Sequence, residues 1–245
     1  RPVRQWQRGG HEEKLEADFR KKLMESELKA IRSQMNPHFI FNVFNSIEAY
    51  VIESDSKSAS SLIHKFATLS RIVLENSRSA LVGITSELHL IKLYLELEQD
   101  RFAYNFSFQI SIDPLLDIQD KKIPSMLIQP LVENAVHHGI RHLGDRPGVI
   151  RINLRQTAAC IVIEVLDNGV GFAHKEPSRQ QNFKTTSFGL KGVRDRLNLI
   201  NDKSPYPVAS LIVVSLPATG EFSTMISISL PVIGVDPDDN DLHDN

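Results

Sequence analysis

Cysteine is almost absent from this 245-residue chain, which contains a single one, Cys160. A lone cysteine excludes an intrachain disulfide and a cysteine-rich metal cluster, and it fits a reducing compartment. Basic residues are not in excess either, because 28 Lys and Arg stand against 30 Asp and Glu, for a formal net charge of −2. No basic run is interleaved with aromatic residues, so nucleic acid is not an expected partner.

Long apolar runs are also missing. No uninterrupted stretch approaches the roughly 18 residues that span a bilayer, and no signal peptide opens the chain. The chain begins with Arg1 instead of Met, so we expect it to be a piece of a longer protein. Hydrophobic residues make up 41% and charged residues 24%, which are ordinary values for a globular protein with a buried core.

The first half of the chain has the spacing of amphipathic helices. Apolar residues recur at 4-3-4 intervals in three runs, which are Met24, Leu28, Ile31 and Met35, then Ile40, Phe44, Ile47 and Val51, then Leu62, Phe66, Leu69 and Val73. The polar stretch 54–58 separates the last two runs and predicts a helical hairpin. A further helix is expected over 86–102. We therefore predict a linker over 1–10 and a helical domain over 11–104.

The second half predicts an α/β domain over 105–233, followed by an acidic, disordered tail over 234–245. Strands are expected over five short apolar or alternating segments: 106–113, 149–155, 161–166, 211–216 and 225–230. One helix is expected to start at about Pro124, which precedes it, and to reach about Gly139, and another is expected over 189–200. The polar segment 173–187 is long enough to form a flap over a site.

The first candidate site is the segment NPHFIFNVFN, residues 36–45. Pro37 removes a backbone donor and clashes with the preceding turn, so a helix kinks or breaks there. His38, Asn42 and Asn45 follow at i, i+4 and i+7 and share one helix face. A carboxamide could hold one imidazole nitrogen and leave the other as a nucleophile, since an unperturbed imidazole is largely neutral near pH 7. The alternative is a solvent-facing histidine with helix-capping asparagines.

The second candidate is LIQPLVENAVHHG, residues 127–139. Asn134 is polar amid an apolar helix face, and a carboxamide oxygen suits Mg²⁺ that already holds phosphates. His138 comes one turn later and could donate to a phosphate oxygen. The alternatives are a surface-facing helix end and a zinc pair of His138 with His142, which Gly139 and the lack of clustered acids or cysteines disfavour.

The third candidate is LDNGVGF, residues 166–172, at the end of an expected buried strand. Asp167 can accept a hydrogen bond from an adenine amino group. Gly169 and Gly171 let the backbone approach a ligand without a Cβ in the way. A plain hairpin turn is the alternative.

The fourth candidate is SFGLKGVR, residues 187–194, where a helix begins after the expected flap. The free amides and dipole of a helix start suit phosphate. Lys191 and Arg194 could add positive charge, although an exposed helix face would explain either residue.

Taken in this order, the four segments resemble the LytS/YehU-type sensor histidine kinases. MNPHFIFNVFNSI is similar to that family's phosphoacceptor motif, IQPLVENAVHHG to its N box, LDNGVGF to its G1 box and FGLKGVRDRL to its G2 box. The resemblance covers residues 28–232. It implies a fold of class α plus α/β, with a helical hairpin dimerisation domain that forms a four-helix bundle in the dimer. A Bergerat-type α/β sandwich that binds ATP, the GHKL or HATPase_c domain of gyrase, Hsp90 and MutL, would follow.

The same resemblance implies a role for each motif residue. His38 corresponds to the phosphoacceptor, with Asn42 beside it, Asn134 to the Mg²⁺ ligand and Asp167 to the adenine-binding acid. The remaining nucleotide-binding positions are His138, Gly169, Gly171, Gly189, Leu190 and Lys191. The sequence departs from the pattern where Ser187 replaces the first glycine of the G2 box and Gly192 replaces a common Asn.

The function implied is that of a two-component sensor kinase, which uses ATP and Mg²⁺ to phosphorylate its own His38. A homodimer would pass the phosphoryl group to an aspartate of a response regulator, of LytTR type by the resemblance. The chain would be the cytoplasmic fragment of an inner-membrane bacterial sensor, in contact with the membrane only through segments missing here. A pseudokinase or nucleotide-binding scaffold is one alternative, supported by Ser187. An ATP hydrolase is another, disfavoured because Pro130 stands where such enzymes place a water-activating glutamate.

Overall fold

The computed structural model describes residues 37–101, 106–158, 160–171, 188–202, 209–217 and 220–231. The chain divides between Arg78 and Ser79 into two compact units, and each is described by itself. The predicted linker, the first apolar run, the flap and the acidic tail lie outside the described residues. In the described part of the chain, no helix combines the length and the apolar character that a membrane crossing requires.

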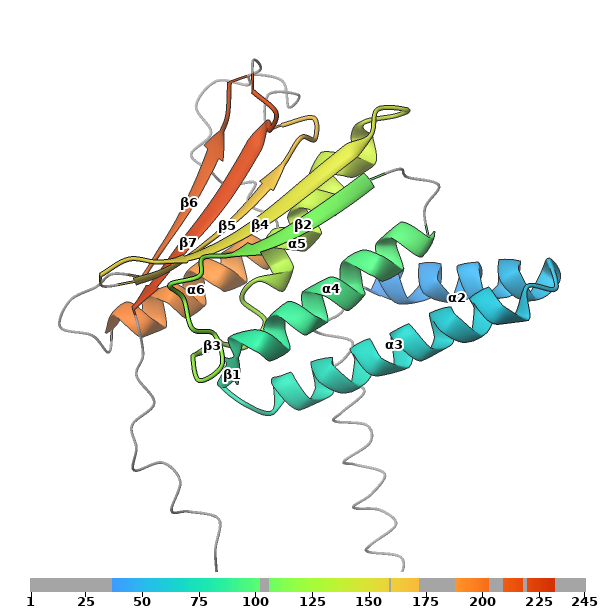
Figure 1. The fold of residues 1–245 in the computed structure, drawn as a ribbon, viewed down its shortest axis with the longest axis horizontal. Coiled ribbons are helices and arrows are strands. Elements are labelled where there is room, and N and C mark those ends of the chain that lie inside the picture. Colours follow the sequence, from blue (N-terminus) through green and yellow to red (C-terminus); the bar gives the residue numbers. More distant parts are fainter. Residues whose placement is uncertain are drawn as a thin grey trace, which may run out of the picture. The chain divides into compact units, whose positions relative to one another are not determined.

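The first unit contains the predicted helical hairpin, formed by α2 (Pro37–Ile52) and α3 (Ser56–Ser77) (Figure 1). The turn between them contains Ser54 in a left-handed conformation, with φ of 60°. Asp55 caps α3, because its Oδ1 accepts a hydrogen bond from Ser58 N at 3.0 Å. Hydrogen bonding by Ser58, through its side chain first and then its backbone N–H, lowers the pKa of the Asp55 carboxyl. The helices touch through Phe44 and Phe66, whose ring centroids are 5.6 Å apart.

The second unit begins with β1 (Leu81–Gly83) and α4 (Ile84–Arg101). β1 pairs antiparallel with β3 (Lys122–Pro124), so this ladder joins the start of α4 to the second unit. The sequence predicted the helix but assigned it to the helical domain ending at residue 104. Helical periodicity shows which face is buried and does not show which partner covers it.

The core of the second unit is a five-stranded sheet of order β2-β4-β5-β7-β6. Its strands are β2 (Phe106–Ile112), β4 (Gly148–Gln156), β5 (Cys160–Asp167), β6 (Ser210–Ser215) and β7 (Thr224–Pro231). β2 and β4 are parallel, and the other pairs are antiparallel. Alternate residues of β4, namely Ile150, Ile152 and Leu154, are at most 1% exposed, as expected when one face of a sheet is covered. The architecture is α plus α/β, as the sequence predicts.

Helices gather along one side of this sheet, including α6 (Phe188–Asp202) and a segment that starts with α5 (Gln129–Asn134) (Figure 1). This segment continues as a π-helical turn, Ala135–Gly139, and a 3₁₀ turn, Ile140–His142. The predicted start of this helix at Pro124 was wrong, because Pro124 ends β3. Pro130 instead occupies the first helical turn, where its missing N–H costs nothing.

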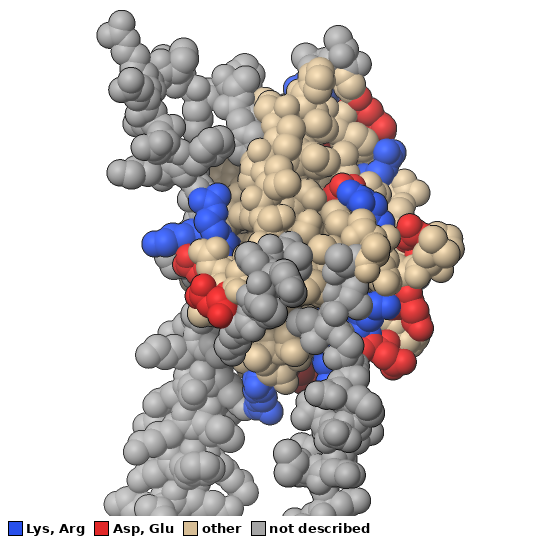
Figure 2. Space-filling model, turned by 90° about the vertical axis from the view of Figure 1, so that its left-hand side faces the viewer, with Lys and Arg blue, Asp and Glu red and all other residues tan. Residues whose placement is uncertain are grey.

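Charged side chains do not form one large patch among the described residues on the face in Figure 2. Lys and Arg are interspersed there with Asp and Glu, and neutral residues separate them. This mixed pattern matches the small net charge of the chain.

Candidate active site

The end of β5 and the end of the π-helical turn meet at one point. Asp167 is 2% exposed, and its Oδ1 accepts a hydrogen bond from Gly169 N at 2.9 Å. A Cβ added at Gly139 would lie 2.5 Å from that oxygen, and one added at Gly169 would lie 2.3 Å from Gly139 Cα. Val170 N also donates to Gly139 O at 3.4 Å. The second and third sequence motifs therefore form one site, whose packing requires both glycines.

Burial raises the pKa of the Asp167 carboxyl to about 6, although the hydrogen bond from Gly169 N acts in the opposite direction. The group is thus mainly ionised at pH 7 and above. A carboxylate removed from water is stabilised by an additional donor. The exocyclic amine of adenine is such a donor.

The turn after Asp167 is held by the side chain of Asn168. Its Oδ1 accepts from Val149 N at 2.7 Å, and its Nδ2 donates to Pro147 O at 3.1 Å. Gly171 has φ of 70°, a backbone conformation that favours glycine. Sequence reasoning assigned no separate role to Asn168, although asparagine in an Asp-Asn-Gly segment is a recognisable turn former.

Ser223, just before β7, and Thr224, its first residue, complete the turn from the other side. Ser223 Oγ donates to Gly169 O at 2.8 Å and to Asp167 O at 3.2 Å. Thr224 is buried and is the register partner of Asp167 on the neighbouring strand. No local signal in the sequence could have identified these two residues, because only the pairing of β5 with β7 brings them to Asp167.

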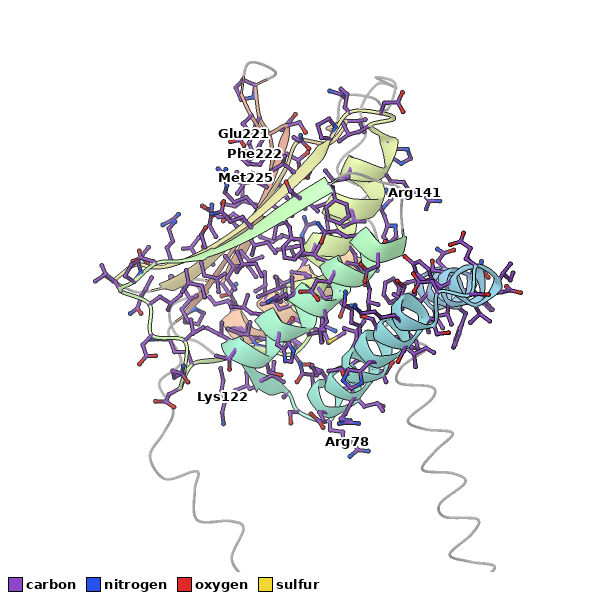
Figure 3. All side chains as sticks on the ribbon, turned by 45° about the vertical axis from the view of Figure 1, so that its right-hand side comes forward. Arg78, Lys122, Arg141, Glu221, Phe222 and Met225 are labelled. Carbon is purple, nitrogen blue, oxygen red and sulfur yellow. The ribbon has the colours of Figure 1, made fainter. Side chains whose placement is uncertain are left out.

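The loop that carries Ser223 is fixed on β4. Glu221 and Phe222 lie next to each other at the end of this loop (Figure 3). The Arg151 guanidinium lies 4.7 Å from the centre of the Phe222 ring, and its Nη2 is 3.4 Å from Glu221 Oε2. These contacts hold the loop against the sheet and place Ser223 beside the Asp167 turn.

Asn134 is the last residue of α5 and is 8% exposed. The π-helical turn that follows Asn134 ends at Gly139. One short segment therefore carries both the predicted metal ligand and the junction with Asp167. His138, the histidine singled out by sequence reasoning, is exposed. His137 points inward, with its Nε2 3.3 Å from Tyr94 Oη on α4.

Glu133, adjacent to Asn134, has a carboxyl with a pKa raised to about 7. Burial is the main cause, and the nearby Glu98 on α4 adds to it, while a hydrogen bond from Gln129 Nε2 at 2.7 Å counteracts both. Sequence reasoning did not identify this buried polar interface between α4 and α5.

The loop before α5 is held by two other helices. Glu87, in the first turn of α4, is fully buried and accepts hydrogen bonds from Met126 N at 3.3 Å and Ile128 N at 3.1 Å. Arg196 of α6 donates to Met126 O at 2.8 Å. Burial raises the pKa of the Glu87 carboxyl, and the backbone donors lower it. Two helices, α4 and α6, therefore determine where α5 begins.

The start of α6 approaches the start of α5, since a Cβ at Gly189 would lie 3.2 Å from Pro130 Cβ. Leu190 is 2% exposed, so its side chain belongs to the core and only its backbone can face a ligand. Lys191 is exposed. The fourth motif is thus placed beside the second.

His38 lies in the first turn of α2, in the other unit, and its side chain lies outside the described residues. Asn42 is half-buried one turn later, and its carbonyl oxygen accepts from Ser46 Oγ at 3.1 Å. Pro37 is the first described residue of α2, so the expected kink or break at this residue stays a prediction.

The chain is similar to known proteins. A histidine kinase family model matches residues 26–106. The sensor protein LytS of Oceanobacillus iheyensis is 34% identical over 192 residues, which cover 75% of this chain and 32% of the relative. The sensor histidine kinase BtsS of Escherichia coli is 35% identical over 146 residues, covering 60% of this chain and 25% of the relative.

Among solved structures, a mycobacterial sensor histidine kinase, MprB, aligns with a TM-score of 0.42 and 18% identity, covering 63% of this chain and 98% of that one. The chain spans about a third of the length of the LytS relative. The class of protein that this chain resembles is therefore the histidine kinases, since residues 26–106 match that family and the sequence relatives are sensor kinases. More narrowly, three quarters of the chain is similar in sequence to a sensor protein of LytS type.

Proposed function

We propose that this chain is the kinase portion of a two-component sensor, which transfers the γ-phosphoryl group of ATP to His38 and then to an aspartate of a response regulator. The observation that carries the nucleotide site is the junction of Gly139, Asp167 and Gly169. Two glycines pack closely around a buried carboxylate, which accepts a hydrogen bond from Gly169 N and would be stabilised by a further donor. The exocyclic amine of adenine would supply that donor.

The other residues suit the rest of the nucleotide. Mg²⁺ would neutralise phosphate charge, and Asn134 offers one neutral oxygen ligand to it. In the described ranges, no three His, Cys, Asp or Glu side chains cluster as a metal site. A single protein ligand fits Mg²⁺, which is usually held by one or two protein groups together with substrate phosphates. The backbone of Gly189 and Leu190 at the start of α6, with Lys191, would bind phosphate oxygens.

His38 would act as the nucleophile through a neutral imidazole nitrogen. Phosphoryl transfer requires mainly positioning and charge stabilisation from the protein. Pro130 cannot act as a base toward water, which favours transfer to His38 over hydrolysis of ATP.

Exposed apolar side chains on the hairpin support a homodimer. Phe41, Phe44, Val51 and Ile52 of α2 and Ile63 of α3 are each at least half exposed. A two-helix hairpin with apolar residues on its outer faces is stabilised when a second hairpin completes a four-helix bundle. The regulator would be of LytTR type, and the kinase portion would act in the cytoplasm beneath a membrane-embedded sensor region.

Incubation with γ-labelled ATP tests the proposal. The parent protein should incorporate label in the presence of Mg²⁺, and His38→Gln should incorporate none while its affinity for ATP stays unchanged. His64→Gln, on an exposed face of α3, is the matched control and should label normally. Label that persists in His38→Gln would refute this acceptor. Tight ATP binding without any label in the parent would favour a pseudokinase.

A further inference from the structure

The helical segment that joins the two ends of the site is not a regular α-helix. After Asn134 it continues as the π-helical turn Ala135–Gly139, and the N–H of Ile140 lies between two acceptors, the carbonyl oxygens of Ala135 and Val136. A π-turn closes over one more residue than an α-turn, and such turns occur frequently at functional sites. The spacing between Asn134 and Gly139 therefore depends on which of these two turns forms.

Two residues of α4 contact the middle of this turn. Tyr94 and Glu98 lie four residues apart on α4 and are at most 1% exposed. Tyr94 Oη is 3.3 Å from His137 Nε2, and Glu98 Oε1 is 3.9 Å from the same nitrogen. His137 is the central residue of the π-helical turn. An anchor at this position resists a change of the turn toward α-helical geometry.

The polar contacts extend along one face of the segment. Gln129, Glu133 and His137 are spaced four residues apart, and Gln129 Nε2 donates to Glu133 Oε1 at 2.7 Å. Polar groups buried between two helices favour one arrangement, because any slip leaves them without partners in a medium of low dielectric constant.

We propose that Tyr94 and Glu98 are positioning residues that hold His137, and through it the π-helical turn that sets the distance between Asn134 and the Gly139–Asp167 junction. This inference rests on the proposed nucleotide site. The affinity for a ligand that reaches both ends, which is a nucleoside triphosphate with its Mg²⁺, depends on that distance. Adenosine reaches only the Asp167 end and does not depend on it.

Two variants test the proposal, Tyr94→Phe, which removes one hydroxyl, and Glu98→Gln, which removes one charge at nearly constant volume. Glu96→Gln is the matched control, since Glu96 lies on the same helix and pairs with Lys92 at 3.9 Å near the surface. Hydrogen exchange on the ligand-free proteins should be faster over residues 139–143 in both variants than in the parent or the control. Affinity for Mg²⁺-ATP should fall about tenfold, the equivalent of one lost hydrogen bond, and affinity for adenosine should stay unchanged.

Unchanged exchange over residues 139–143 in Tyr94→Phe would overturn the inference, and this measurement needs no nucleotide. Equal losses for Mg²⁺-ATP and adenosine would also overturn it, because they would indicate general destabilisation. If the parent itself bound no Mg²⁺-ATP, the proposed function would fail separately. If Glu98→Gln did not fold, the exchange and the affinities of Tyr94→Phe would decide.

Discussion

Gly139→Ala should damage the proposed adenine site, because an added methyl group would occupy the space of the Asp167 carboxylate. The new Cβ would lie 2.5 Å from Asp167 Oδ1 and 2.9 Å from its Cγ. Gly139 has φ of −96°, a value that alanine also adopts, so the penalty comes from lack of space. The carboxylate cannot retreat without cost, since it is buried and accepts the hydrogen bond from Gly169 N.

Three terms set the size of the effect on folding. Alanine in a helix gains up to about 1 kcal/mol over glycine, overpacking costs about 1–3 kcal/mol, and loss of the hydrogen bond to Asp167 costs about 1 kcal/mol. The net destabilisation is then about 2 kcal/mol, which lowers the Tm by roughly 4–8 °C in a protein of this size. A displaced Asp167 would lose a charged hydrogen bond to adenine, so ATP affinity should fall about 10- to 100-fold.

Calorimetric titration with ATP and with adenosine, beside a melting curve on the same preparation, measures both effects. Gly192→Ala is the matched control, because it lies in α6 and a Cβ there meets nothing within 4 Å. That variant should be at least as stable as the parent and bind nucleotide normally. If Gly139→Ala bound ATP and adenosine as the parent does, the proposed role of the Gly139–Asp167 junction would be refuted.

Three further outcomes are expected. Asn134→Ala should weaken ATP binding in Mg²⁺ and leave binding in EDTA unchanged, so equal losses in titrations under both conditions would contradict its role as the metal ligand. Asp167→Asn should lose adenine selectivity in competition titrations, yet melt at a higher temperature at pH 8. The reason is that burial raises the pKa of the carboxyl from 3.8 to about 6. As the pH rises through this window, ionisation of Asp167 lowers the free energy of unfolding of the ligand-free parent by at most roughly 3 kcal/mol. The melting temperatures of parent and variant should therefore converge near pH 4. Ser54→Gly should raise the melting temperature of the protein, because it relieves about 1 kcal/mol of left-handed backbone strain at an exposed turn. An unchanged melting curve would show that this strain is negligible.

Local patterns were sufficient for most of the elements. The 4-3-4 spacing of Leu62, Phe66, Leu69 and Val73 predicted α3, because a helix that buries one face must repeat apolar residues at that interval. The alternation at Phe106 predicted the start of β2 for the same kind of reason. The Asp-Asn-Gly turn after Asp167 was also evident, since its chemistry is contained in neighbouring residues.

The sequence by itself determined which segments carry the proposed phosphoacceptor and nucleotide-binding residues, because residue type and local spacing single out His38, Asn134 and Asp167 as candidates. Tertiary structure alone decided what surrounds them. Three contacts join residues that are far apart in the chain: Gly139 packs against Asp167, Ser223 donates to the turn beside it, and Tyr94 of α4 contacts His137. No local pattern encodes such contacts, since they form only when strands pair and helices pack, and the free energy of burying each group depends on the partner that the fold supplies.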